Sequence, residues 1–310
     1  MASVKPILCV GCTVIDFVTI SASYPKEDTD ERCLDGSWQR GGNASNASTV
    51  LRLLDAKVEF FGMLSKSDGF RVLLDDLRRR EIGVQHCPMT DKDPPFSSVI
   101  IAQDTGSRTI VHCNKNYPYV TWEDFSKIDL NRYGWVHFEA RHPTETIKMM
   151  RSVQEHNSRQ DNRIFISLDF ETLYEKNLEL CHLCDYVVFS KDLATRQGWR
   201  TAQDTCKELA LALQPSRPNI ICPWGNTGAS CLDSSNECNN VPAYEPASVV
   251  DTLGAGDSFM AGFIYASYVM KCRLPDAVDF ANHVAGHKIS NYGYDHIAQL
   301  NKDKENAIKL

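Results

Sequence analysis

Short apolar runs bounded by turn residues alternate with longer amphipathic segments along most of this 310-residue chain. The apolar runs predict β-strands at residues 7–11, 14–20, 58–62, 135–139, 164–169, 186–190, 219–223 and 228–232. The amphipathic segments predict helices at residues 44–55, 69–81, 144–156, 171–183 and 202–213. Because strands that alternate with helices usually pair in parallel, this order predicts an α/β fold with a doubly wound, mostly parallel central sheet and helices on both faces. Ligands of such sheets bind beyond the carboxyl ends of the strands.

Two regions interrupt this alternation, because residues 17–38 and 97–113 contain strand patterns with no helix between them. In the second region, residues 97–103 and 108–113 predict a hairpin that turns at residues 104–107. We therefore expect segments from about 12–40 and 97–118 to form a small β-sheet, or lid, inserted in a single domain that spans residues 1–310.

Composition and charge limit the function classes. Hydrophobic residues make up 43% of the chain, which is enough for one large core. The net charge is −7 and the longest basic run is residues 78–80, so nucleic-acid binding is disfavoured. No segment approaches the ~20 apolar residues of a membrane span, and the start of the chain has no basic leader, so a cytosolic protein is expected. The twelve cysteines are scattered and their only CxxC pair has no second pair at zinc spacing, so neither disulfides nor a zinc site is expected.

The most informative motif is residues 250–259, Val-Asp-Thr-Leu-Gly-Ala-Gly-Asp-Ser-Phe. Gly254, Ala255 and Gly256 are predicted to form the first, uncapped turn of a buried helix. Its free amides and the positive end of the helix dipole would bind phosphate oxygens. Asp257, just inside this turn, could accept a proton from a hydroxyl beside that anion. The alternative is a glycine-rich turn that only begins a helix.

A second motif lies at residues 39–46, where a Gly-Gly turn leads into an amphipathic helix. Asn43 and Asn46 are three residues apart and so lie on one face of the first helical turn. Each amide offers donors and an acceptor, which suits the recognition of sugar hydroxyls. Taken alone, Asn43 would be interpreted as a helix N-cap.

Together these motifs resemble the signatures of the ribokinase-type (PfkB) carbohydrate kinases. Further segments narrow the resemblance to the ketohexokinase branch of that family, namely residues 24–28, 32–34, 38–46, 106–110 and 249–257. The similarity extends from about residue 7 to about residue 294. It implies a ribokinase-like fold and ATP-dependent phosphorylation of a ketohexose, above all D-fructose, at the C1 hydroxyl, giving fructose 1-phosphate and ADP.

The resemblance also implies a role for individual residues. It makes Asp257 the general base and Gly254, Ala255 and Gly256 the anion hole. The sugar-binding residues that it implies are Asp16, Gly42, Asn43, Asn46 and, reaching into the neighbouring subunit's site, Asp28. The nucleotide contacts that it implies are Arg108, Trp224, Gly225, Asn226, Thr227, Gly228 and Asn282.

For cofactors and partners, the resemblance implies MgATP as co-substrate, with a hydrated magnesium ion that no protein ligand holds directly. It further implies a potassium ion near Asp251 and Thr252, and a homodimer formed through the β lid. The chain also departs from the family pattern. The loop after Trp224 lacks the acidic residues that relatives usually carry, and the magnesium-organising Asn-x-x-Glu motif, expected near residues 190–193, is not intact.

Three alternatives remain open at this stage. The acceptor of the same fold could be another sugar or a nucleoside. The chain could instead be a catalytically silent sugar sensor that keeps the pocket. A dinucleotide-binding oxidoreductase would need a GxGxxG turn after the first strand, and the sequence around Gly11 does not supply one.

Overall fold

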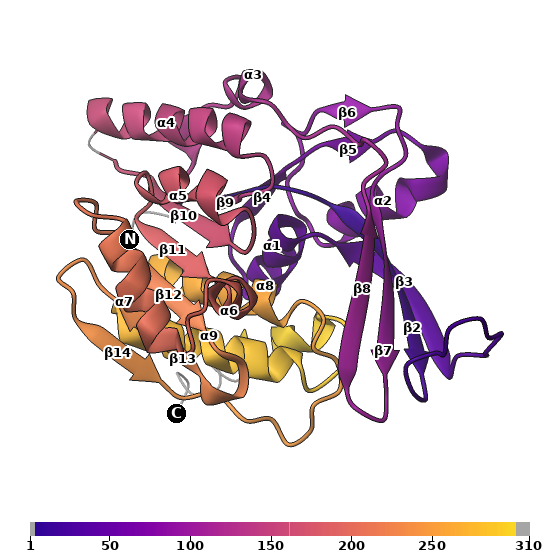
Figure 1. Cartoon of the computed structure of the whole chain (residues 1–310). Coiled ribbons are helices and arrows are strands. Elements are labelled where there is room, and N and C mark those ends of the chain that lie inside the picture. The colour runs from indigo at the N-terminus through magenta and orange to yellow at the C-terminus, as the bar shows by residue number, and fades with distance from the viewer. Residues whose placement is uncertain (1–3, 161, 302–310) are drawn as a thin grey trace.

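The computed structural model describes residues 4–160 and 162–301 (Figure 1). Its main element is an eight-stranded sheet in the order β14-β13-β12-β11-β10-β9-β1-β4. The six strands from β12 to β4 run parallel, whereas β13 is antiparallel to both of its neighbours. The strands are β1 (Ile7–Val10), β4 (Val58–Phe61), β9 (Trp135–Glu139), β10 (Phe165–Phe170), β11 (Tyr186–Phe189), β12 (Asn219–Pro223), β13 (Ala229–Leu232) and β14 (Cys238–Val241).

Successive side chains of a strand point to opposite sides of the sheet, so buried strands place apolar residues on both faces. Helices cover both of these apolar faces. In β1, Ile7 and Cys9 belong to one core, and Leu8 and Val10 belong to the other. The first core is covered by α1 (Asn43–Leu53), α2 (Arg71–Arg79), α8 (Ala255–Ile264) and α9 (Leu274–Lys288). The second is covered by α3 (Trp122–Phe125), α4 (Pro143–Arg159), α5 (Tyr174–Cys181), α6 (Lys191–Arg196) and α7 (Ala202–Ala212). The doubly wound α/β fold predicted from the sequence is confirmed.

A separate four-stranded sheet stands beside the main one, in the order β3-β2-β7-β8 (Figure 1). Its strands are β2 (Val14–Ser21), β3 (Asp35–Gly41), β7 (Phe96–Ala102) and β8 (Ser107–Cys113). The predicted hairpin is present as β7 and β8, and Gly106 in its turn has a φ of 65°. Val18, Ile20, Val99 and Ile101 of this sheet form a small core with Leu253. The small sheet is thereby packed against the glycine-rich motif at residues 250–259.

Shorter elements complete the chain. They are β5 (Leu64–Ser65), β6 (Met89–Thr90), the 3₁₀ turns Asp68–Phe70, Leu130–Arg132, Gly225–Thr227 and Asp295–Ala298, and the π-helical turn Tyr265–Val269. The helix predicted at 171–183 begins only at Tyr174, because Leu173 has a left-handed φ of 53°. The strand patterns did not locate β14, and helices α6 and α9 were not predicted. In the described ranges, no helix is both long and apolar enough to cross a membrane.

Candidate active site

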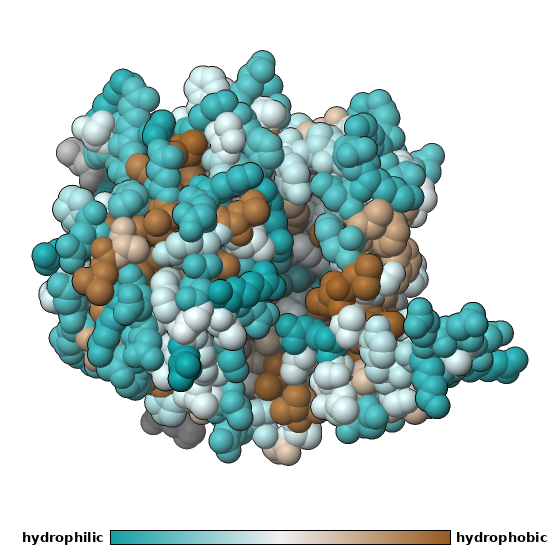
Figure 2. Space-filling model, in the orientation of Figure 1, coloured by the Kyte–Doolittle hydropathy of each residue, from teal (hydrophilic) through white to brown (hydrophobic). Residues whose placement is uncertain are grey.

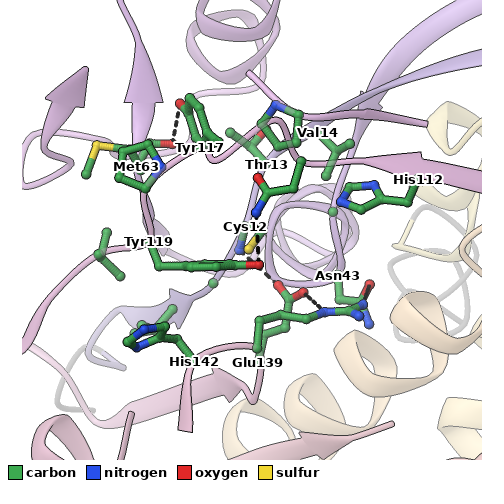
Figure 3. Close-up of a pocket in the computed structure, with 18 of the residues that line it drawn as sticks. Cys12, Thr13, Val14, Asn43, Met63, His112, Tyr117, Tyr119, Glu139 and His142 are labelled. Carbon is green, nitrogen blue, oxygen red and sulfur yellow. Dashed lines mark hydrogen bonds and ion pairs between the residues drawn. The ribbon is translucent and has the colours of Figure 1, made fainter. Parts of the chain in front are cut away.

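The Gly-Gly turn before α1 lines a cavity of about 370 Å³ between the main sheet and the small sheet (Figure 3). Gly42 begins α1 with a φ of 94°, and a Cβ there would lie 2.4 Å from the carbonyl oxygen of Cys12. Only glycine fits this close approach of two chain segments. The turn places Asn43 and Asn46 in the first turn of α1, and both line the cavity together with Asp16 and Gly42.

Asp257 lies next to this cavity, although it comes from the far end of the sequence. Helices α1 and α8 pack together, and Asn46 Nδ2 donates a hydrogen bond of 2.7 Å to Asp257 Oδ2. Asp257 is only 9% exposed. Burial, together with the negative charge of Glu171, raises the pKa of Asp257 to about 7. A carboxylate with this pKa is a suitable proton acceptor near neutral pH.

The start of α8, where the sequence predicts an anion hole, has backbone amides that are free among the described residues. Gly254 is the N-cap in a left-handed conformation with φ 74°, and no side chain caps the helix. The amides of Gly256 and Asp257 have no acceptor within residues 4–160 and 162–301, so they are free to bind an anion. No atom lies within 4 Å of where a Cβ of Gly256 would stand, so open space faces this residue. Glycine here leaves room for a ligand.

Arg108 brings a positive charge to the same place. It projects from the exposed strand β8, and its Nη1 donates a hydrogen bond of 3.0 Å to the hydroxyl of Thr252. The small sheet therefore positions a guanidinium beside the glycine-rich turn, where it can contact the phosphates of a nucleotide.

A group of charged residues that sequence reasoning missed lies beneath Asn43. Asn43 Nδ2 donates to Asp169 Oδ2 at 2.9 Å and to Glu171 Oε2 at 2.8 Å. Arg141 pairs with Glu139 at 2.8 Å and with Glu171 at 3.4 Å. Desolvation raises the pKa of both Asp169 and Glu171, and repulsion by Glu171 adds to the shift of Asp169 while repulsion by Glu139 adds to that of Glu171. The sequence did hold one signal that could have identified these residues. Glu139, Arg141, Asp169 and Glu171 all lie at or just beyond the carboxyl ends of β9 and β10, where ligands of such sheets bind.

The remaining wall of the cavity is aromatic and polar. Figure 3 shows Tyr117, Tyr119, His112 and His142 around it. Tyr117 donates to the carbonyl oxygen of Met63 at 3.2 Å, and the rings of Tyr119 and His142 lie 5.4 Å apart. Apolar ring faces beside hydroxyl and amide groups suit a ligand that has both C–H faces and hydroxyl groups.

The predicted nucleotide loop extends from Trp224 to Gly228, directly after β12. Trp224 is half-buried, and Lys191 Nζ lies 5.5 Å from the centre of its ring. Residues 225–227 are exposed. Asn282 is buried, and its Nδ2 donates to the carbonyl oxygen of Pro242 at 2.8 Å, so this nitrogen holds the backbone after β14.

Two features that the resemblance implies are not found in the cavity of a single chain, namely the sugar contact of Asp28 and a vacant potassium position. Asp28 is exposed on the 22–34 loop, which projects from the far end of the small sheet (Figure 1), and it does not line the cavity. At the expected potassium position, the carbonyl oxygen of Asp251 already accepts from Lys288 Nζ at 2.9 Å. Lys288 had no signal in the sequence, because a lysine in a last helical turn usually complements the helix dipole at the surface.

The family follows from a comparison with known proteins. Residues 4–299 match the model of the pfkB family of carbohydrate kinases. The chain belongs to this family. It is a sugar kinase, a phosphotransferase with ATP as co-substrate and a sugar as acceptor. Across residues 4–160 and 162–301, no three His, Cys, Asp or Glu side chains are grouped so that they could hold a metal ion.

Individual relatives agree with this family. Mouse ketohexokinase is 37% identical over 296 residues, which covers 94% of this chain and 99% of the mouse protein. A fructosamine kinase of Bacillus subtilis is 23% identical over 288 residues. The ribokinase structure from Giardia lamblia aligns over 98% of this chain and 99% of its own with a TM-score of 0.84 and 16% identity. An Arabidopsis thaliana ribokinase structure, complexed with ribose and ATP, aligns over 97% and 99% with a TM-score of 0.76 and 18% identity. These structures share the fold.

Proposed function

We propose that this sugar kinase transfers the γ-phosphoryl group of MgATP to the C1 hydroxyl of a ketohexose, foremost D-fructose. The products are fructose 1-phosphate and ADP. The observation that carries the proposal is the 2.7 Å hydrogen bond between Asn46 and Asp257, which joins the sugar-binding turn to the glycine-rich turn. The identity of 37% to mouse ketohexokinase over nearly the whole chain supports the choice of acceptor.

In this proposal the cavity holds the sugar and Asp257 takes its proton. Asp16, Gly42, Asn43 and Asn46 bind the sugar hydroxyls, and they present the C1 hydroxyl to the Asp257 carboxylate. As that hydroxyl oxygen bonds to the γ-phosphorus, its proton passes to Asp257, and the bond from the γ-phosphorus to the β–γ bridging oxygen breaks. The base should contribute roughly 10²–10⁴-fold to the rate.

Charge on the migrating phosphoryl group is balanced by the start of α8 and by Arg108. In the cradle of Gly254, Ala255 and Gly256, the Gly256 amide is free in the described part of the chain, and together with the free Asp257 amide and the positive end of the helix dipole it faces the phosphoryl group. The Ala255 amide donates to the Thr252 carbonyl oxygen at 3.3 Å and so holds the turn in shape. The nucleotide lies over residues 224–228, whose backbone and polar side chains replace the acidic residues of other family members. The magnesium ion arrives with the nucleotide as part of the substrate. The expected potassium ion is no part of this proposal, because the oxygens of Asp251 and Thr252 are already hydrogen-bonded.

A homodimer through the small sheet belongs to the same proposal. Trp38 and Phe17 are paired neighbours on β3 and β2, and Ser98 connects them to Val111 of β8 in the same row. Trp38 is 56% exposed, Phe17 43% and Val111 64%. Figure 2 shows hydrophobic residues over the region of strand β8 and a hydrophilic loop that projects beyond the small sheet. Pairing two such faces would bury them and would bring Asp28 toward the partner's sugar.

One assay tests the proposed reaction. ADP release is measured with fructose, with other ketoses, with fructosamine, and with ribose and adenosine as alternative acceptors, and NMR identifies the phosphorylated carbon. We expect the highest kcat/KM with fructose and phosphate on C1. Faster turnover of ribose, adenosine or fructosamine, or phosphate on another carbon, would replace the acceptor while leaving the kinase family intact. Sedimentation at micromolar concentration tests the dimer, and a species that is only monomeric would refute it.

A further inference from the structure

A fully buried lysine lies behind the glycine-rich turn. Lys288 ends helix α9, and its side chain is 0% exposed. Its Nζ donates to the carbonyl oxygen of Asp251 at 2.9 Å and to the Asp251 carboxylate at 2.5 Å, and it lies 5.4 Å from the ring centre of Tyr294. An ammonium group is removed from water only when it is paired, and this pairing joins α9 to the segment that carries the anion cradle.

The oxygens around Lys288 are those to which the family resemblance assigns a potassium ion, and they do not fit one. One carboxylate oxygen of Asp251 accepts from the Leu253 amide at 2.9 Å, and the other accepts from Lys288 and from the Gly293 amide at 3.3 Å. The Thr252 carbonyl accepts from the Ala255 amide at 3.3 Å, and its hydroxyl accepts from Arg108. A potassium ion bound to these oxygens would have to take the place of the Lys288 ammonium group. It would then be repelled by that group, which is buried close by.

We propose that the Lys288 ammonium is the resident cation of this site and positions the turn at residues 251–257 in place of a monovalent ion. Lys288 touches neither substrate, so it is a positioning residue. It holds Asp251, and the other carboxylate oxygen of Asp251 fixes the amide of Leu253, which immediately precedes Gly254. The negative charges of Asp251 and Asp257 oppose the effect of burial and favour the charged form of Lys288.

The first experiment uses the unmodified protein and needs no variant. Turnover and thermal unfolding are compared in the chlorides of potassium, sodium and tetramethylammonium at equal ionic strength. We expect kcat to agree within about twofold and Tm within roughly one degree, because the site already holds its cation. Potassium-specific activation of about tenfold or more, with a potassium-specific rise in Tm, would overturn the proposal.

The second experiment removes the charge. Lys288→Met keeps a long side chain but no ammonium, and Lys207→Met changes an exposed lysine of α7 as the control. We expect Lys288→Met to lose ~10²-fold in kcat with little change in sugar affinity, because a positioning charge acts mainly in the transition state. Ammonium, methylammonium or potassium should then restore kcat by about tenfold or more, whereas the control should respond to none of them.

The outcomes separate a positioning role from a purely structural one. A folded Lys288→Met protein with near-normal kcat, or one whose lost activity no cation restores, would contradict the proposal. If this variant does not fold, the cation series on the unmodified protein decides alone. The inference about Lys288 rests on the proposed function only because the kcat measurements need a sugar that the enzyme phosphorylates. If no sugar leads to ADP release, the proposed function fails. The effect of potassium on Tm then still tests the role of Lys288.

Discussion

The proposed active site has a sugar side and a nucleotide side, and the two are built differently. On the sugar side, Asp16, Asn46 and Asp257 are buried, and Asn46 bonds directly to Asp257. On the nucleotide side, Arg108 and residues 225–227 are exposed, and Arg108 contacts only the Thr252 hydroxyl among its described hydrogen bonds. The sugar side is therefore preorganised by the protein, whereas the nucleotide side is completed by the substrate.

Preorganisation brings several acidic groups close together. Burial raises the pKa of Asp16, Asp169, Glu171 and Asp257, and the negative charge of neighbouring carboxylates adds to the shift of the last three. This arrangement opposes folding while it prepares a proton acceptor. Substitutions on the sugar side should consequently change both chemistry and stability, and those on the nucleotide side should change only the kinetics with ATP.

The largest effect is expected for Asp257→Asn. We expect kcat to fall by ~10²–10⁴-fold, because the amide cannot accept the proton of the sugar hydroxyl. Sugar affinity, measured by calorimetry, should remain within a few-fold. Asp279→Asn, an exposed change on α9, is the control. A near-normal kcat in Asp257→Asn would show that this residue is not the general base. The contrast between a preorganised sugar side and an open nucleotide side would then lose its main support.

The same variant should show the stability effect. The folded protein keeps a proton on Asp257 up to about pH 7, while the unfolded chain loses it near its ordinary pKa of 3.8. The contribution of this carboxyl is therefore most favourable below pH ~4 and is lost as pH rises to ~7. Asp257→Asn should raise the free energy of unfolding at pH 8 by on the order of 1–4 kcal/mol, and by less at pH 5. Urea unfolding at both pH values checks this, and equal gains at both would contradict it.

The next effect concerns Arg108→Ala. We expect kcat/KM for ATP to fall by roughly 10²-fold, because a mobile positive charge near the phosphates is lost. Since the side chain is exposed, Tm should not change. Arg108→Lys should recover part of the loss. Arg273→Ala, which changes an exposed arginine at the N-cap of α9, is the control and should leave kcat/KM unchanged. A large loss of stability in Arg108→Ala would contradict the expectation that substitutions on the nucleotide side change only the kinetics with ATP.

A smaller effect is expected for Asn46→Ala. Its amide donates to the Asp257 carboxylate and so lowers the pKa of that group. Removing it should move the acid limb of the kcat profile upward by about one pH unit. Ser48→Ala, a buried change in the same helix, is the control and should leave the profile in place. An unmoved profile in Asn46→Ala would mean that this bond does not tune the base.

The smallest effect is expected for Trp224→Leu. The contact between Lys191 and the half-buried Trp224 ring is worth ~0.5–1 kcal/mol. Because it steadies the loop over which we propose that the nucleotide lies, we expect its loss to raise the KM for ATP about two- to fivefold. The KM for sugar should not change. Trp122→Leu, on the exposed helix α3, is the control. A rise in the KM for sugar instead would place Trp224 on the other half of the site.

Much of the fold could be predicted because its signals are local. The strands of the main sheet except β14, together with β7, are runs whose apolar pattern reports burial. Strand β8 was predicted as the second arm of a hairpin, although nearly all of its residues are exposed. The start of α8 was also predictable, since Gly254 and Gly256 mark a turn. Helix α9 was not predicted, and the start of α5 was placed three residues too early, because the left-handed backbone at Leu173 leaves no mark in the apolar pattern.

The sequence alone determined the alternation of strands and helices, the two glycine turns and the residue types at each. Only the tertiary structure decided that Asn46 and Asp257, which are 211 positions apart, share a hydrogen bond, and that Lys288 lies beneath Asp251. The physical reason is that local patterns record which side of an element is buried. Which buried groups meet depends on how α1, α8 and α9 pack against one another, and that is settled by the shapes of many side chains at once.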